Sequence, residues 1–396
     1  MTGPLSGVRI VDLSQMATGP LATAWLADQG ADVVKVEPPG GDGLRNFGSF
    51  AKGGITAFVL SCNRGKRSVG IDLSARPGVD LVRRMVADAD VFVQNFRPGV
   101  VERLGLDPEV LRADNPGLIT VSISGYGLAG PMSDRPVFDP VIQAITGHVA
   151  TQVNPEIPFP DLVRHIVVDK ATASFVAQAV TAALFERERS GQGQHIDLSM
   201  VDSSLAFLWP DAMMGETLLD DDVVGGPLVS ELYSLTRCAD GQLVYWAGTE
   251  KQLHGLYRAL GHPEWISDER FGTKAASDRL ENRQTLGALV GRAFEAMDVA
   301  DAVDALVAHD VPCGLITDLG EVASQEQVVA NESLVEFEHP TAGRVRQPRP
   351  PARFARTPAD PAWGAPTIGQ HTDEILGELG LTAAQIAEVR ASGVVF

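Results

Sequence analysis

The first third of the chain alternates short β-branched apolar runs with helical patterns, and this alternation constrains the fold more than any other feature. Val8–Leu13 and Asp32–Glu37 have the composition of buried strands, and Pro20–Gln29 between them has that of a helix. Two parallel strands joined through a helix form a right-handed βαβ unit. The sequence therefore predicts an α/β fold with a doubly wound, mostly parallel, Rossmann-like sheet.

The same alternation continues up to residue 122. Further strands are expected at Ser68–Leu73, Val91–Gln94 and Leu118–Ser122, with helices at Gly78–Ala87 and Pro108–Ala113. The turn after the first expected strand, SQMATGP, lacks G-x-G-x-x-G spacing, and the chain has no Walker A sequence, so no nucleotide redox cofactor is expected. G-x-S-x-G and H-E-x-x-H are also absent, which argues against serine hydrolases and zinc proteases.

A chain of 396 residues exceeds what one hydrophobic core usually supports, so two domains are expected. Beyond residue 210 the composition changes, and strands are expected near 231–237 and 243–247. The Pro-rich run 347–366 predicts an extended strap, because proline removes a hydrogen-bond donor and fixes φ. We predict a large α/β domain over 1–215, a linker over 216–230, a small α+β domain over 231–330, and a strap with C-terminal helices over 331–396 that returns to the large domain.

The charge and cysteine content limit the partners and the compartment. The net charge of −19 argues against nucleic acid and anionic membranes as partners. The three cysteines, Cys62, Cys238 and Cys313, lie far apart and lack metal-ligand spacing, so no metal is expected. With neither a signal-peptide pattern nor an apolar run of 18 residues, the expected location is the cytoplasm.

One stretch has the opposite charge balance. From Arg64 to Arg103 there are eight basic and five acidic residues, so 8 − 5 gives a net +3. This excess fits a seat for a phosphorylated ligand, and it fits solvated helix and loop faces equally well.

Several segments together resemble class III CoA-transferases of the CaiB/BaiF type. They are GVRIVDLSQMATGP, LADQGADVVKVEPPGGDGLR, NRGKRSVGIDL, DVFVQNFRPGVVERLGL, ISGYGLAGP, RSGQGQHIDLSMVDSS and GQHTDEILGELG, and they run from residue 7 to 380. Formyl-CoA transferases and α-methylacyl-CoA racemases share this signature. The resemblance implies coenzyme A, as acyl-CoA substrate and product, a small carboxylic acid as second substrate, and an interlocked homodimer.

The resemblance places a catalytic nucleophile at Asp169, in the segment RHIVVDKAT. We expect this residue between a short strand and a long helix, where helix N–H groups favour the ionised carboxylate. An aspartate before a helix is otherwise an ordinary N-cap. In the family scheme the carboxylate attacks an acyl-CoA thioester and forms an anhydride, then an aspartyl-CoA thioester.

The resemblance also implies a CoA-binding set in the large domain. Its members are Met16, Thr18, Ile71, Asp72, Leu73, Asn95, Phe96, Arg97, Arg103, Gly125, Phe138 and Asp139. An arginine suits a phosphate because its guanidinium donates two parallel hydrogen bonds, and glycine permits close backbone approach. Asn95 and Phe96 are equally compatible with a turn and with the core.

Phe138 separates the two enzyme classes. Racemases have a proton-accepting histidine at this position, and a phenyl ring cannot accept a proton. A transferase is therefore favoured, with a 2-methylacyl-CoA epimerase or a CoA-binding protein with weak thioesterase activity as alternatives. Ala17 replaces a glutamine of formyl-CoA transferases, and their longer glycine run is reduced to Gly225 and Gly226, which disfavours formyl or oxalyl substrates. Five large apolar residues fit either a larger acyl pocket or ordinary packing: Trp209, Met213, Met214, Tyr233 and Trp246.

Overall fold

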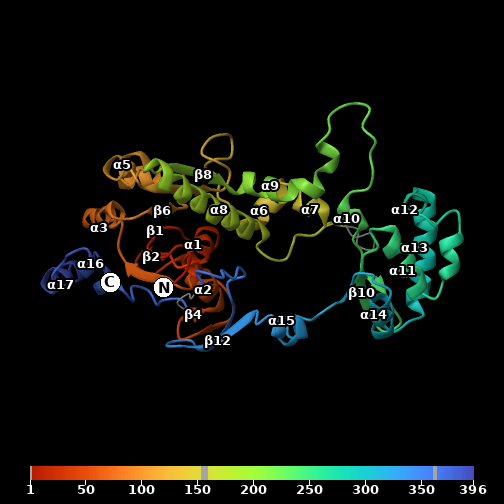
Figure 1. Cartoon of the computed structure of the whole chain (residues 1–396). Helices are drawn as coiled ribbons and strands as arrows, with labels where there is room; N and C mark the ends of the chain where they lie inside the picture. Colours follow the sequence, from red (N-terminus) through yellow and green to blue (C-terminus); the bar gives the residue numbers. More distant parts are fainter. Residues whose placement is uncertain (1, 153–158, 360–363) are drawn as a thin grey trace. The chain divides into compact units, whose positions relative to one another are not determined.

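The computed structural model describes residues 2–152, 159–359 and 364–396, and a six-stranded parallel sheet organises its first unit (Figure 1). The order is β5-β2-β1-β6-β7-β8, so the chain adds strands on one side of β1 first and then, from β6 on, on the other side. Numbered along the chain this is 3-2-1-4-5-6, the order of doubly wound sheets. The predicted α/β fold is confirmed, although β8 was not predicted. The strands are β1 (Arg9–Asp12), β2 (Asp32–Glu37), β5 (Arg67–Gly70), β6 (Val91–Gln94), β7 (Ile119–Ser124) and β8 (His195–Ser199).

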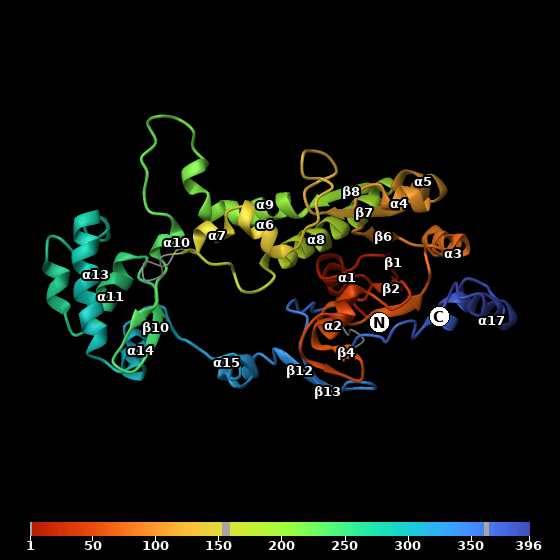
Figure 2. The same cartoon turned by 180° about the vertical axis from the view of Figure 1, so that it is seen from behind.

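Helices cover both faces of the sheet because successive side chains of each strand point to opposite sides. Ile10 and Val33 join one buried cluster with α1 (Thr18–Asp28) and α8 (Val167–Ser190), and both views show α8 beside α1 (Figures 1 and 2). Their neighbours Val11 and Val34 join a second cluster on the other face. That cluster includes residues of α3 (Arg76–Ala87), α5 (Pro108–Asp114) and α16 (Thr372–Glu378), and α17 (Ala383–Ala391) packs against it.

The chain divides into two compact units. The first contains the residues up to Val224 together with Glu332–Phe396, and the second is Gly225–Asn331. In the second, β10 (Gln242–Tyr245) pairs with β9 (Thr236–Arg237) and β11 (Cys313–Leu315). The helices α11 (Glu250–Ala259), α13 (Leu280–Glu295) and α14 (Val299–Ala308) contribute its core.

The strand expected at 231–237 is wrong over its first part. Val229–Leu232 is the short helix α10, and the Glu231 carboxylate accepts a hydrogen bond from the Leu228 N–H at 3.1 Å. Local capping chemistry therefore overrides the apolar character of this segment.

The strap begins in a hairpin that was not predicted. β12 (Leu334–His339) pairs with β13 (Gly343–Pro348), and Gln347 Nε2 donates to the Leu60 carbonyl at 2.7 Å. From 349 to 359 the chain has no helix or strand, and residues 360–363 of the predicted strap lie outside the described residues. In the described parts of the chain no helix is both long and apolar enough to cross a membrane.

The remaining elements are short or flank the site. They are β3 (Ala51–Lys52), β4 (Ile55–Thr56), α2 (Ala57–Cys62), α4 (Val100–Leu104), α6 (Asp139–Ile145), α7 (His148–Thr151), α9 (Met200–Ala212), α12 (Lys274–Ser277), α15 (Glu326–Ala330) and the 3-10 turns η1 (Gly43–Asn46), η2 (Met214–Glu216), η3 (Pro263–Ser267) and η4 (Val322–Ser324).

Candidate active site

Most of the predicted site residues follow the carboxyl ends of parallel strands, which all lie at one edge of the sheet. Met16 and Thr18 follow β1, Ile71–Leu73 follow β5, Asn95–Arg97 follow β6, and Gly125 follows β7. The edge includes the reversal point between β1 and β6, where open α/β sheets bind their ligands.

Asp169 is the third residue of α8, and its carboxylate meets Thr18, the first residue of α1. The Thr18 hydroxyl donates a hydrogen bond to Asp169 Oδ1. No side chain or backbone group among the described residues donates to Oδ2. Two helices thus begin at this carboxylate, and their N-terminal N–H groups favour an anion. One oxygen is held and the other is available for chemistry.

The strand expected directly before Asp169 is wrong. Arg164 and His165 form no strand, and α8 already begins at Val167. The β-branched run Ile166–Val168 favours a strand locally, but a carboxylate from another helix satisfies the first free N–H groups of α8.

That carboxylate belongs to Asp139, the first residue of α6. Its Oδ2 accepts from the N–H groups of Val168 at 2.8 Å and Asp169 at 3.0 Å, and its Oδ1 accepts from Gln143 Nε2 at 2.5 Å. Asp139 is only 3% exposed. Both oxygens are engaged inside the protein, so the geometry gives Asp139 a role in positioning α8.

Gln143 was missed by the sequence reasoning. It lies four residues after Asp139 on α6, and its Oε1 accepts from the Val163 N–H at 2.9 Å. It therefore ties the loop before α8 to α6. The only signal in the sequence was the i, i+4 spacing of an amide after the aspartate.

Burial raises the pKa of Asp169 to about 6, the Thr18 hydrogen bond opposes this rise, and the negative charge of Asp139 adds to it. At neutral pH the carboxylate is mostly ionised, yet it is more basic than an exposed aspartate. Such a group is a better nucleophile than an ordinary carboxylate.

Asn95 supports the turn after β1. Its Oδ1 accepts from the Gln15 N–H and its Nδ2 donates to the Gln15 carbonyl, both at 2.8 Å. Phe96 is half-buried against the second core cluster, and its N–H donates to Gln94 Oε1 at 2.7 Å. These contacts favour the turn and core interpretations of the two side chains.

The segment after β5 is likewise tied into the fold. Ile71 is fully buried and forms a β-bridge with Val395, while Leu73 packs against the second cluster. The Asp72 side chain accepts from the Ser74 N–H at 2.9 Å. The Ile71 N–H donates to the Glu37 carbonyl and the Asp72 N–H to the Val394 carbonyl, both at 2.9 Å, so both N–H groups are already paired within the fold.

Most of the basic stretch is neutralised internally. Arg64 pairs with Asp28, Lys66 with Asp12, and Arg67 with three carboxylates. By contrast, Arg97 and Arg103 are exposed, and their side chains make no ion pair within the described ranges. These two arginines remain the candidates for a phosphate.

Gly125 and Phe138 flank the loop between β7 and α6. A Cβ on Gly125 would lie 2.3 Å from Val137 Cγ1, so only glycine fits there. Phe138 immediately precedes α6 and is 61% exposed.

The five candidate acyl-pocket residues are divided between the two units. Tyr233 and Trp246 make an edge-on ring contact, with centroids 5.7 Å apart, beside an apolar pocket in the second unit. Trp209, Met213 and Met214 lie in or just after α9 in the first unit.

The chain is similar to CoA-transferases over nearly its whole length. The profile of CoA-transferase family III matches residues 5–372. Succinyl-CoA:glutarate CoA-transferase of Mus musculus is 34% identical over 400 residues, which cover 99% of this chain and 90% of the mouse protein. Succinyl-CoA–D-citramalate CoA-transferase of Chloroflexus aurantiacus is also 34% identical, over 99% of this chain and 98% of its own length.

Solved structures share the fold. A Mycobacterium tuberculosis protein matches with a TM-score of 0.82 and 31% identity, over 94% of this chain and 99% of that one. A CaiB/BaiF family protein from Brucella suis matches with a TM-score of 0.79 and 31% identity, over 96% of this chain and 100% of that one.

Proposed function

Because this chain belongs to CoA-transferase family III, we propose that it moves CoA from an acyl-CoA donor to a carboxylic acid through covalent intermediates on Asp169. The supporting observation is the carboxylate itself. It lies where two helices begin, with Oδ1 held by Thr18 and Oδ2 without a hydrogen-bond donor among the described residues.

The raised pKa of Asp169 eases the first chemical step. A thiol of pKa about 8.5 is a poorer leaving group than an ordinary aspartate carboxylate of pKa about 3.9. At about 1.36 kcal/mol per pKa unit, this difference in basicity is worth roughly 6 kcal/mol. Burial brings the pKa of Asp169 to about 6, so the gap narrows to about 3 kcal/mol. Hydrogen bonds to the developing oxyanion and retained CoA binding must offset the remainder.

The proposed reaction proceeds through two anhydrides. An Asp169 oxygen adds to the thioester carbonyl, and the C–S bond breaks to give CoA thiolate and a mixed anhydride. The thiolate attacks the aspartyl carbonyl, which releases the donor acid as its carboxylate and leaves an aspartyl-CoA thioester. The acceptor carboxylate then attacks this thioester and expels the thiolate, which gives a second anhydride between Asp169 and the acceptor. The thiolate attacks the acceptor's acyl carbon in this anhydride, which forms the new acyl-CoA and restores the Asp169 carboxylate.

CoA is the substrate that the sheet edge is proposed to seat. Arg97 and Arg103 supply guanidinium groups that no carboxylate neutralises in the described chain, and such groups suit CoA phosphates. The turn after β1 completes the proposed seat.

Dicarboxylic acids are the first acceptors to test. The mouse and Chloroflexus relatives are named for succinyl-CoA as donor and for glutarate or D-citramalate as acceptor. We propose succinyl-CoA as donor and a short dicarboxylate as acceptor.

The test combines transfer assays with trapping of the intermediate. Purified protein is incubated with succinyl-CoA and each acid, and new acyl-CoA is quantified by mass spectrometry. Hydroxylamine should convert Asp169 to a hydroxamate only when an acyl-CoA donor is present. Asp169→Asn, which keeps the size of the side chain, should lose transfer by about a thousandfold or more. Full transfer by Asp169→Asn would exclude the proposal.

Two other outcomes would identify the alternatives. Solvent deuterium entering the α-carbon of a 2-methylacyl-CoA indicates an epimerase. Release of free acid at the same rate with and without an acceptor acid indicates a thioesterase.

We further propose an interlocked homodimer. The chain leaves the first unit at Val224 and returns to it at Glu332, which is the connectivity that a ring threaded by a partner needs. Apolar side chains on two helices of that unit are also uncovered, with Phe185 of α8 68% exposed and Phe207 of α9 54% exposed. A partner chain would remove this surface from water.

A further inference from the structure

Several side chains hold the backbone of the turn between β1 and α1. Its Ser14 N–H donates to Asp12 Oδ1 at 2.9 Å, and both polar backbone groups of Gln15 bond to Asn95. Met16 adopts a left-handed conformation with φ of 63°, which a residue with a side chain rarely adopts unless its surroundings enforce it. The turn leads directly to Thr18.

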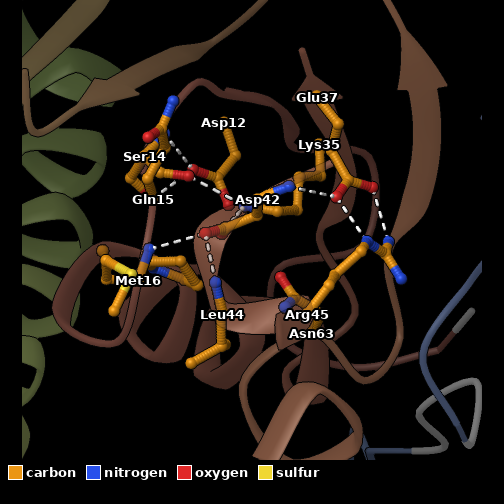
Figure 3. A network of polar contacts seen from close by, with 12 residues as sticks. Asp12, Ser14, Gln15, Met16, Lys35, Glu37, Asp42, Leu44, Arg45 and Asn63 are labelled. Atoms are coloured by element: carbon orange, nitrogen blue, oxygen red, sulfur yellow. Dashed lines mark hydrogen bonds and ion pairs between the residues drawn. The ribbon is translucent and has the colours of Figure 1, made fainter. Parts of the chain in front are cut away.

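An ion pair from the β2 side enforces this conformation. Asp42 Oδ1 accepts from the Met16 N–H at 2.9 Å and from the Leu44 N–H at 3.0 Å, while Asp42 Oδ2 lies 2.9 Å from Lys35 Nζ (Figure 3). Lys35 Nζ also donates to the Ser14 carbonyl at 2.8 Å. The pair therefore holds both Ser14, which precedes Gln15, and Met16, which follows it.

The pair is itself buried and braced. Both side chains are 1% exposed. The Asp42 N–H donates to Glu37 Oε1 at 3.3 Å, and Glu37 is clamped by Arg45 through bonds of 2.7 and 2.6 Å (Figure 3). A buried charge pair is expensive to desolvate and is weak evidence for stability, so a contribution to stability does not account for this pair.

We infer that Asp42 and Lys35 are positioning residues for the reaction, because they fix the Met16 turn that presents the Thr18 hydroxyl to Asp169. This inference rests on the proposed function of Asp169. Neither residue touches the carboxylate, so their effect passes through Thr18.

The pH dependence of transfer separates positioning from direct electrostatics. Ionised Asp169 is the reactive form, and its pKa is held down by the Thr18 bond. The acidic limb of the kcat profile is the fall in kcat at low pH as Asp169 becomes protonated. Loss of the Thr18 bond should move this limb to higher pH. Direct removal of the negative charge of Asp42 would move the limb to lower pH, because a nearby negative charge disfavours a carboxylate.

The other two ionisable groups that interact with Asp169 are not substituted in these variants. Asp139 acts on it from α6, and Cys62 lies within its field on α2. Burial raises the pKa of the Cys62 thiol to about 12, so this thiol remains neutral throughout the assay range.

The experiment compares Asp42→Ala with Asp42→Asn and with Thr18→Val. Asp42→Ala should lower kcat on the order of 10- to 100-fold and move the acidic limb up by about one pH unit, as Thr18→Val should. Asp42→Asn keeps an oxygen for the Met16 N–H but loses the ion pair with Lys35, so it should move the limb less than Asp42→Ala. The double variant Thr18→Val with Asp42→Ala should show no further shift beyond that of Thr18→Val.

Asp28→Asn is the matched control. Asp28 forms a comparable buried ion pair with Arg64, and it is the last residue of α1, so it is far along the helix from Thr18. It should lower the melting temperature without moving the limb. If Asp42→Ala does not fold, Lys35→Met takes its place, and its upward shift should vanish in the Thr18→Val background.

The outcomes distinguish this inference from the proposed function. An unchanged or lowered limb in Asp42→Ala, or a Lys35→Met shift that persists with Thr18→Val, overturns the positioning role while transfer still depends on Asp169. Wild-type transfer that survives Asp169→Asn overturns the proposed function instead.

Discussion

At the scale of single residues, the proposed nucleophile is placed where ionisation is costly. An aspartate with a raised pKa binds a proton more readily in the folded chain than in the unfolded chain. The folded state is therefore penalised as pH rises through the interval from 3.8 to about 6. Reactivity and stability are thus in opposition at Asp169.

Asp169→Asn should stabilise the protein at neutral pH, because it removes a buried charge and keeps an oxygen for the Thr18 hydroxyl. The shift from 3.8 to about 6 corresponds to at most about 3 kcal/mol of unfolding free energy at pH 7. Urea unfolding of both proteins measures it at pH 7.5 and at pH 4, where the difference should largely disappear. Equal stability at both pH values contradicts the assigned burial.

Asp139→Asn should have the opposite effect on reactivity from loss of the Thr18 bond. The amide can still accept from the N–H groups of Val168 and Asp169, but the negative charge that raises the pKa of Asp169 is gone. The acidic limb of the kcat profile should move to lower pH. The weaker helix cap should also cost about 1 kcal/mol of stability. Movement of the limb to higher pH would contradict this electrostatic account.

At the scale of elements, a glycine controls the docking of the last strand of the sheet. A Cβ on Gly193 would lie 2.0 Å from the Leu118 carbonyl oxygen. The adjacent Gln194 carbonyl accepts from the Thr120 N–H at 3.0 Å, which begins the pairing of β8 with β7. Close approach of two backbones is a position where only glycine fits.

Gly193→Ala should therefore lower the free energy of unfolding by about 2 kcal/mol or more, because the two backbones must separate. Gly377→Ala in α16 is the matched control, since nothing lies within 4 Å of its added methyl group. That variant should gain up to about 1 kcal/mol from helix propensity. Thermal unfolding measures both, and equal melting temperatures would refute the steric argument.

The sequence predicted elements well where the local pattern is strong. The limits of β2 and β6 agree with Asp32–Glu37 and Val91–Gln94, because each is a short run rich in valine that a break in the pattern bounds on both sides. β8 was missed although HIDLS alternates polar and apolar residues, which is typical of a half-buried strand at the edge of a sheet. The short helix α10 was predicted as a strand from its apolar composition. The hydrogen bond from the Leu228 N–H to Glu231, which favours a helix start, was not taken into account.

The site was predictable only in its list of residues. Thr18 lies 151 positions from its partner Asp169, and Asp139 supplies its cap from 30 positions away. Such pairings depend on strand order and helix packing, which local sequence patterns do not determine. The sequence therefore indicated an aspartate at a helix start, while the raised pKa and its causes required the fold.

At the scale of the whole molecule, we expect two chains per particle. Light scattering during size-exclusion chromatography should give the mass of two chains, and the mass should persist on dilution because threaded chains cannot separate without unfolding. A folded particle with the mass of one chain would contradict the interlocked dimer.

Because the first unit is built from two separate parts of the chain, it cannot be completed early during synthesis. Ile375 and Leu376 of α16, with Val394 and Val395, complete the hydrophobic cluster on one face of a sheet whose strands all precede residue 200. A nascent chain leaving the ribosome therefore leaves exposed the part of that face that these four residues cover, until residues 375–395 have been translated, while the intervening second unit can already fold. Nascent chains stalled before residue 370 should consequently be clients of chaperones.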